Sequence, residues 1–169
     1  MAEAYKLPPA TPVPPFSRQL HDNYRSAVYV CQNYRLLCGA VPPDFQDFLF
    51  ANGWHNFTFV TAYNPFSVPG RSLVENQADQ QHLERLLVNR GLPFLPASAE
   101  DPSGKWPVEP GVFVFDASLP LVLHLGLRFG QNAVYRGDLR RTSRVLWCHG
   151  VLREGNALGQ VGRALWPTY

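Results

Sequence analysis

The chain has 169 residues, 46% of them hydrophobic and 17% charged, which is enough to bury about two-thirds of its unfolded surface around one core. Its formal net charge of +2 and pI near 8.5 place it below the strongly basic range of dedicated nucleic-acid binders. The longest apolar stretch, residues 119–127, falls well short of the roughly 20 residues that a membrane-spanning helix needs, which excludes such a span.

The N-terminal segment, residues 1–20, is predicted to be a Pro-rich arm, because KLPPATPVPPF (6–16) suits neither a helix nor a central strand. Residues 21–169 are predicted to form one globular domain. From Tyr24 to Leu37, aromatic and β-branched residues at roughly alternate positions favour a strand. Cys31 and Cys38 would face opposite sides of that strand, so they are poor candidates for one metal site.

A short helix is expected after Pro42 and Pro43, with Gly53 as its stop. Residues 57–63 are then expected to form an interior strand, because the run is apolar on both faces. Phe57 and Phe59 would lie on one face, and Val60 and Ala62 on the other. This strand is predicted to be the centre of the sheet.

The next helix is predicted from Leu73 to Asn89, because Ser72 and Glu75 have the spacing of a capping box and Gly91 ends the pattern. At 100° per residue, an apolar stripe on this helix includes two amides. The residues of the stripe are Leu73, Asn76, Gln80, Leu83 and Leu87.

Residues 96–110 are turn-forming throughout and predict a surface loop, followed by an apolar strand at 112–115. Ser118 and Pro120 open a third helix, and two strand-like segments, AVYR and VLWCHGVL, come after it. The order predicts an α/β or α+β fold, in which about three helices pack on a mixed central sheet.

Four segments in this order resemble the domain of unknown function family 3293. They are TAYNPFS (61–67), Asn76, the D-x-x-G-x-W-x-x-E-P run from 101 to 110, and FGQNAV (129–134). The resemblance extends over about residues 24–136. It implies a fold and a set of positions, and it brings no activity with it.

The turn after the strand at 57–63 is the predicted ligand site, because ligands of open α/β sheets bind beyond strand ends. Asn64 precedes Pro65, so an extended backbone is expected there. Arg71 and the start of the next helix would favour an anion, such as the phosphate of a nucleotide. The predicted ligand-binding residues are Thr61, Asn64, Ser67, Arg71, Asn76 and Gln131. The alternative is that such buried polar groups only satisfy backbone at loop ends.

Glu109 lies where a surface loop meets a buried strand. Partial desolvation there would raise its pKa and suit it to general acid or base catalysis. The alternative is a structural acceptor that anchors the loop. The sequence therefore leaves open whether the protein is an enzyme.

The segment RGDLRRTSR (136–144) supports a different function, an interaction module that binds nucleic acid or an acidic partner. Its four arginines, Arg136, Arg140, Arg141 and Arg144, would contact phosphates if they share a face. The alternative is a solvated loop.

The sequence lacks the motifs of other common chemistries. The familiar hydrolase, nucleoside-triphosphate and zinc signatures are absent from the sequence, so no metal or cofactor is predicted. The sequence has three cysteines, an odd number, without close spacing, and it shows no signal-peptide pattern. These features predict free thiols in a reducing compartment and hence a cytoplasmic protein.

Overall fold

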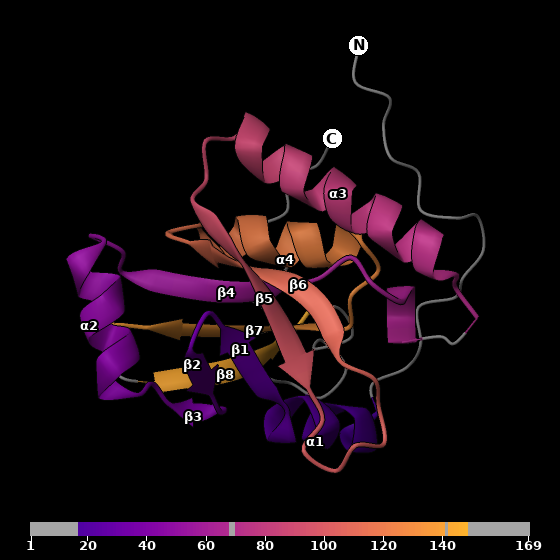
Figure 1. Ribbon diagram of the computed structural model, residues 1–169, viewed down its shortest axis with the longest axis horizontal. Coiled ribbons are helices and arrows are strands. Elements are labelled where there is room, and N and C mark those ends of the chain that lie inside the picture. The colour runs from indigo at the N-terminus through magenta and orange to yellow at the C-terminus, as the bar shows by residue number, and fades with distance from the viewer. Residues whose placement is uncertain (1–16, 68–69, 141, 149–169) are drawn as a thin grey trace.

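The computed structural model describes residues 17–67, 70–140 and 142–148 (Figure 1). This part of the chain holds four α-helices, one more than predicted, and a 3-10 turn: α1 (Arg18–Ser26), α2 (Pro43–Ala51), α3 (Leu73–Asn89), α4 (Leu119–Arg128) and η1 (Pro65–Ser67). None of these helices combines the length and the apolar character needed to cross a membrane. The predicted Pro-rich arm lies outside the described residues up to position 16, and α1 begins within its last residues.

Eight strands form one sheet in the order β2-β1-β5-β6-β4-β7-β8-β3. They are β1 (Val28–Cys31), β2 (Tyr34–Leu36), β3 (Gly39–Ala40), β4 (Asn56–Val60), β5 (Phe94–Glu100), β6 (Glu109–Phe115), β7 (Ala133–Asp138) and β8 (Thr142–Trp147). Only two residues separate the edge strands β2 and β3, so the sheet curls until its edges nearly meet. Every strand pairing is antiparallel, which corrects the predicted mixed sheet within an α+β fold.

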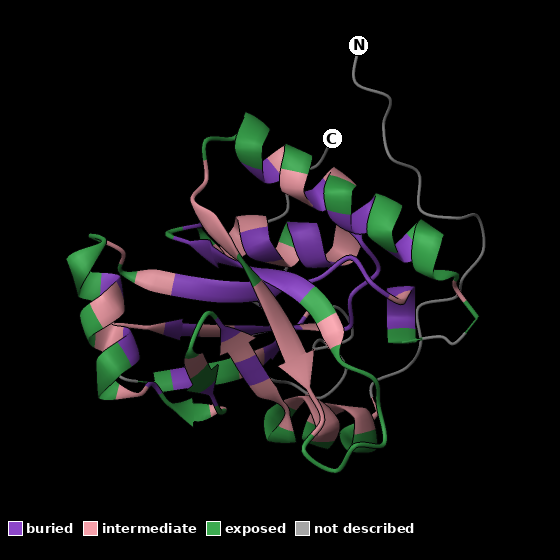
Figure 2. Cartoon of the chain, in the orientation of Figure 1, coloured by how far each residue is buried: buried purple, intermediate pink, exposed green. Residues whose placement is uncertain are grey.

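The centre of the sheet is β4, as predicted, and it is buried on both faces (Figure 2). Val60 packs with the valines of β6 against α3 and α4. Phe57 and Phe59 lie on the opposite face, in an aromatic cluster that α2 covers with Phe45 and Leu49. Because β4 pairs with β6 on one side and β7 on the other, its C-terminal end is held from both sides.

Helix α3 has the predicted bounds, and both halves of the Ser72–Glu75 capping box are present. Asn76 and Gln80 are buried with two leucines of the helix, as the stripe predicted. Leu73, however, is 63% exposed, and Asp79 is buried although it was off the stripe. The buried face is therefore more polar than an ordinary core-facing stripe.

Two segments outside the β4 turn have a different local structure from the one predicted. The strand expected from Tyr24 to Leu37 is instead the end of α1 followed by a β1–β2 hairpin, in which Gln32 has a left-handed φ of 52°. Residues 96–100, expected in a loop, belong to β5, which pairs with β1 and β6. Pairing on both sides overrides the turn-forming composition of this strand.

Candidate functional site at the turn after β4

The turn that follows β4 is strained. The strand ends at Val60 rather than at residue 63, so Thr61, Ala62 and Tyr63 already belong to the turn. Three non-glycine residues then have left-handed φ values: Asn64 (45°), Phe66 (58°) and Ser67 (55°). Such conformations cost on the order of 1–3 kcal/mol each, and they persist where the surroundings fix them.

Buried side chains from α3 and from the segment that follows α4 hold this turn in place. Gln80 Oε1 accepts from the Ala62 N–H at 3.1 Å, and Gln131 Nε2 donates to the Tyr63 carbonyl at 2.9 Å. Thr61 Oγ1 donates to the Pro110 carbonyl at 2.7 Å and accepts from the Tyr63 N–H at 3.0 Å. Thr61 and Gln131 therefore reach the predicted site, but their bonds are to backbone, as in the alternative interpretation.

Asn64 is the centre of the turn. Its N–H donates to Asn76 Oδ1, and Asn76 Nδ2 donates back to Asn64 Oδ1, both at 2.9 Å. The extended backbone expected before Pro65 is wrong, because Asn64 is left-handed and its carbonyl accepts from the Ser67 N–H at 2.8 Å. Asn tolerates this conformation better than most residues, and the two bonds to Asn76 fix it there.

We expect Asn64→Ala and Asn76→Ala to behave as a coupled pair. Asn76→Ala should cost about 2–3 kcal/mol, because it leaves the Asn64 N–H without its partner. A double-mutant cycle by urea unfolding should give a coupling energy of at least about 0.5 kcal/mol. Gln19 and Asn23, which share one exposed hydrogen bond on α1, provide the control pair with coupling near zero. Additive losses for Asn64 and Asn76 would contradict the reciprocal contact.

Glu109 is the first residue of β6 and lies beside this turn. Asn64 Nδ2 is 3.5 Å from Glu109 Oε2, the limit of a hydrogen bond. Burial raises the pKa of Glu109 to about 7, and the Asn64 contact lowers it only in part. Within the described ranges no ion pair reaches this carboxylate. Glu109 is thus a partly buried carboxyl group that has no ion-pair partner in those ranges, and its pKa lies near neutral pH.

A cluster of hydroxyl and amide groups also lies at this turn, around Ser67. The Tyr24 hydroxyl and Ser67 Oγ are 2.9 Å apart, and Asn132 Nδ2 lies 3.4 Å from the former and 3.3 Å from the latter. Burial raises the pKa of Tyr24, and the nearby Glu109 carboxylate adds to the rise. Tyr24 and Asn132 were missed as site residues, because no local pattern places a residue of α1 beside a turn 43 positions away.

The two features expected to attract an anion already have partners. Arg71 forms an ion pair with the buried Asp79. At the N-terminus of α3, the Glu75 carboxylate accepts from the Ser72 N–H at 2.9 Å, so a negative charge already occupies that end. These interactions weaken the case for an anion at this turn.

The predicted arginine cluster does not form one surface. Arg136 points into the fold, where it donates to Thr58 Oγ1 at 2.7 Å and to the Ala117 carbonyl at 3.0 Å. Arg140 is exposed in the turn before β8, Arg144 is exposed on β8, and Arg141 lies outside the described residues. Nucleic-acid binding through this segment therefore stays a prediction that rests on fewer arginines.

Comparison with known proteins agrees with the resemblance. Residues 60–134 match the model of a family described as Protein of unknown function (DUF3293). The match runs from the end of β4 into β7, so it contains the turn, α3, Glu109 and Gln131 but not Tyr24. Neither a curated protein nor a solved structure matches the chain.

Proposed function

We propose that the protein binds a polar small molecule, one that carries hydroxyl or amino groups, at the turn after β4. The observation that carries this proposal is Glu109, a carboxyl group with a pKa of about 7 and no cationic partner among the described residues. A desolvated carboxylate without a partner destabilises a fold, and strongly shifted pKa values gather at functional sites.

The groups around Glu109 supply both donors and acceptors. Asn64 contacts its carboxylate, and the Tyr24 hydroxyl lies close enough to sense its charge. Ser67 is exposed, so the Tyr24–Ser67–Asn132 cluster reaches the surface. Hydroxyl and amide groups of this kind fix the orientation of a polar ligand. An amine would gain most, because it would pair with the ionised carboxylate.

A second candidate function, acid–base catalysis, rests on the same pKa. A carboxyl group that titrates near pH 7 can take up and release a proton at neutral pH, which is what a general acid or base requires. Glu109 would exchange a proton with the bound molecule, and Tyr24 would orient that molecule through its hydroxyl. Acid–base catalysis therefore requires the proposed binding site and, in addition, a chemical change in the bound molecule.

A thermal-shift screen tests the binding proposal. Sugars and polyols, amines, and carboxylic acids are compared at pH 6 and pH 8, and we expect compounds of the first two sets to raise the melting temperature. For a confirmed compound, Glu109→Gln and Tyr24→Phe should each weaken binding by about tenfold, the scale of one charged hydrogen bond.

Glu100→Gln is the matched control. It removes a carboxylate from the end of β5 that is already paired with Arg35 at 2.8 Å. This variant should bind the compound as the unmodified protein does. Equal affinity in Glu109→Gln, or a screen in which only carboxylic acids bind, would refute the proposal.

A further inference from the structure

Five basic side chains on α3, just after it and on α4 are here called the α3–α4 basic cluster. They are His82, Arg85, Arg90, His124 and Arg128. The first two are three residues apart on α3, and the last two are four residues apart on α4, so each pair lies on one helix face. The two helices share one core, and the His82 ring lies 5.9 Å from the Phe129 ring at the end of α4.

The charges of this cluster act on one another across the two helices. Burial lowers the pKa of His82, and the charges of Arg128 and Arg85 lower it further. Burial also lowers the pKa of His124, with added effects from Arg128 and Arg90. Because the charge of Arg128 acts on both histidines, the basic side chains of the two helices contribute to one region of positive potential.

The negative charges nearby do not neutralise this region. Asp79, the acid that affects His82, is paired with Arg71. Glu84 accepts a hydrogen bond from Gln80 on another face of α3. In the part of the chain that the structure describes, no ion pair involves Arg85, Arg90 or Arg128, and the buried Nε of Arg128 has no hydrogen-bond partner.

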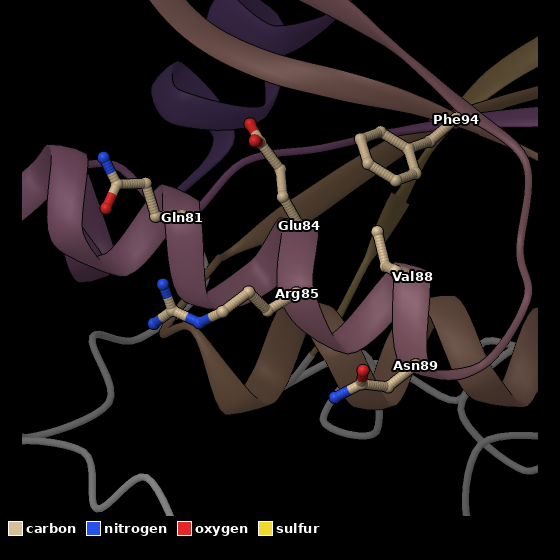
Figure 3. A pocket seen from close by; sticks show the side chains of 6 residues that line it. All are labelled: Gln81, Glu84, Arg85, Val88, Asn89 and Phe94. Carbon is tan, nitrogen blue, oxygen red and sulfur yellow. The ribbon is translucent and has the colours of Figure 1, made fainter.

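An open hollow of about 380 Å³ lies on α3 beside the cluster (Figure 3). Gln81, Glu84, Arg85, Val88, Asn89 and Phe94 line it. Figure 3 shows the Arg85 guanidinium on the opposite side of α3 from Glu84 and Phe94. Arg85 therefore presents its charge away from the Glu84 carboxylate, and it belongs both to the lining of the hollow and to the basic cluster.

We propose that the α3–α4 basic cluster binds the oligophosphate group of a small molecule, at a site separate from the β4 turn. Like charges held together repel one another, and an anion that bridges them removes the repulsion. The α3 side of the cluster is compact, because His82 and Arg90 lie eight positions apart, a rise of only about 12 Å. A nucleic-acid backbone would be tracked by a longer basic stripe, whereas a short chain of phosphates matches a compact group of guanidinium side chains.

Titration of the protein with sodium tripolyphosphate in low-salt buffer, followed by calorimetry, tests this site. We expect saturable binding that Arg128→Gln and Arg85→Gln each weaken by about tenfold. Arg140→Gln removes the same charge from an exposed turn and should change the affinity by less than about twofold, the scale of a screened surface charge. Glu109→Gln should bind tripolyphosphate normally, which separates this site from the β4 turn.

Two further measurements check that Arg128→Gln is folded and that tripolyphosphate binds beside the two histidines. The melting temperature of Arg128→Gln without tripolyphosphate should equal or exceed that of the unmodified protein, because a repelled charge is removed. In NMR titrations, bound tripolyphosphate should raise the pKa of both His82 and His124. The proposal is overturned if tripolyphosphate does not bind, or if Arg140→Gln weakens binding as much as Arg128→Gln. Tighter binding of a single-stranded oligonucleotide than of tripolyphosphate, weakened equally by Arg140→Gln, would also overturn it in favour of a nucleic-acid surface.

Discussion

Gly130→Ala should destabilise the protein by about 3 kcal/mol or more. Gly130 follows α4 with a φ of 66°, a conformation that costs an alanine about 1–2 kcal/mol. A Cβ atom there would also lie 2.8 Å from Cβ of Pro65, which belongs to the strained turn. Neither atom is the flexible end of a long side chain, so the backbone must shift, and overpacking of this kind adds about 1–3 kcal/mol.

Gly91→Ala is the control for this change. Gly91 has nearly the same φ, 63°, but a Cβ atom there meets nothing within 4 Å. Gly91→Ala should therefore lower the free energy of unfolding only by the cost of the left-handed backbone, about 1–2 kcal/mol. Urea unfolding of both variants gives the comparison. Equal losses of stability in Gly130→Ala and Gly91→Ala would mean that the contact between Gly130 and Pro65 does not constrain the turn.

The helices were predictable where side chains cap their own ends. Ser72 with Glu75, and Ser118 before Pro120, fix the starts of α3 and α4 through bonds within a few residues. The position of β4 was also predictable, because a short run that is apolar on both faces belongs in the middle of a sheet. These features depend on local chemistry, so a single sequence contains them.

What the sequence did not contain were contacts between distant segments. The direction of each strand depends on which strand it joins, and β5 gains its structure from β1 and β6 despite Pro96 and Ser98. The candidate site shows the same division. Asn64, Asn76 and Glu109 were predicted beside one turn and do meet there. Their exact bonds, and the approach of Tyr24 from α1, follow from tertiary packing.

Glu109→Gln should make the protein more stable above pH 7 by about 3 kcal/mol and leave it unchanged near pH 4. The pKa of Glu109 is raised from 4.5 to about 7 by burial. Below pH 4.5 the carboxyl is protonated in both the folded and the unfolded chain, so it does not affect their difference. Between pH 4.5 and 7 the unfolded chain loses this proton while the folded chain keeps it, so folding stability falls as the pH rises. A rise of about 2.5 pKa units corresponds to about 3 kcal/mol, complete above pH 7.

The difference in stability between Glu109→Gln and the unmodified protein, measured against pH, distinguishes the two interpretations of Glu109. A structural acceptor that anchors the loop would make Glu109→Gln less stable at pH 8, by about 1–3 kcal/mol. Glu100→Gln loses only an exposed ion pair and should change by about 0–1 kcal/mol, with no gain at high pH. Urea unfolding from pH 4 to pH 8 measures all three proteins. If Glu109→Gln is more stable at pH 8, then Glu109 lowers the stability of its own fold at neutral pH. A residue that costs stability in this way, at a turn strained at three positions, would support the proposed binding role of Glu109 over a structural one.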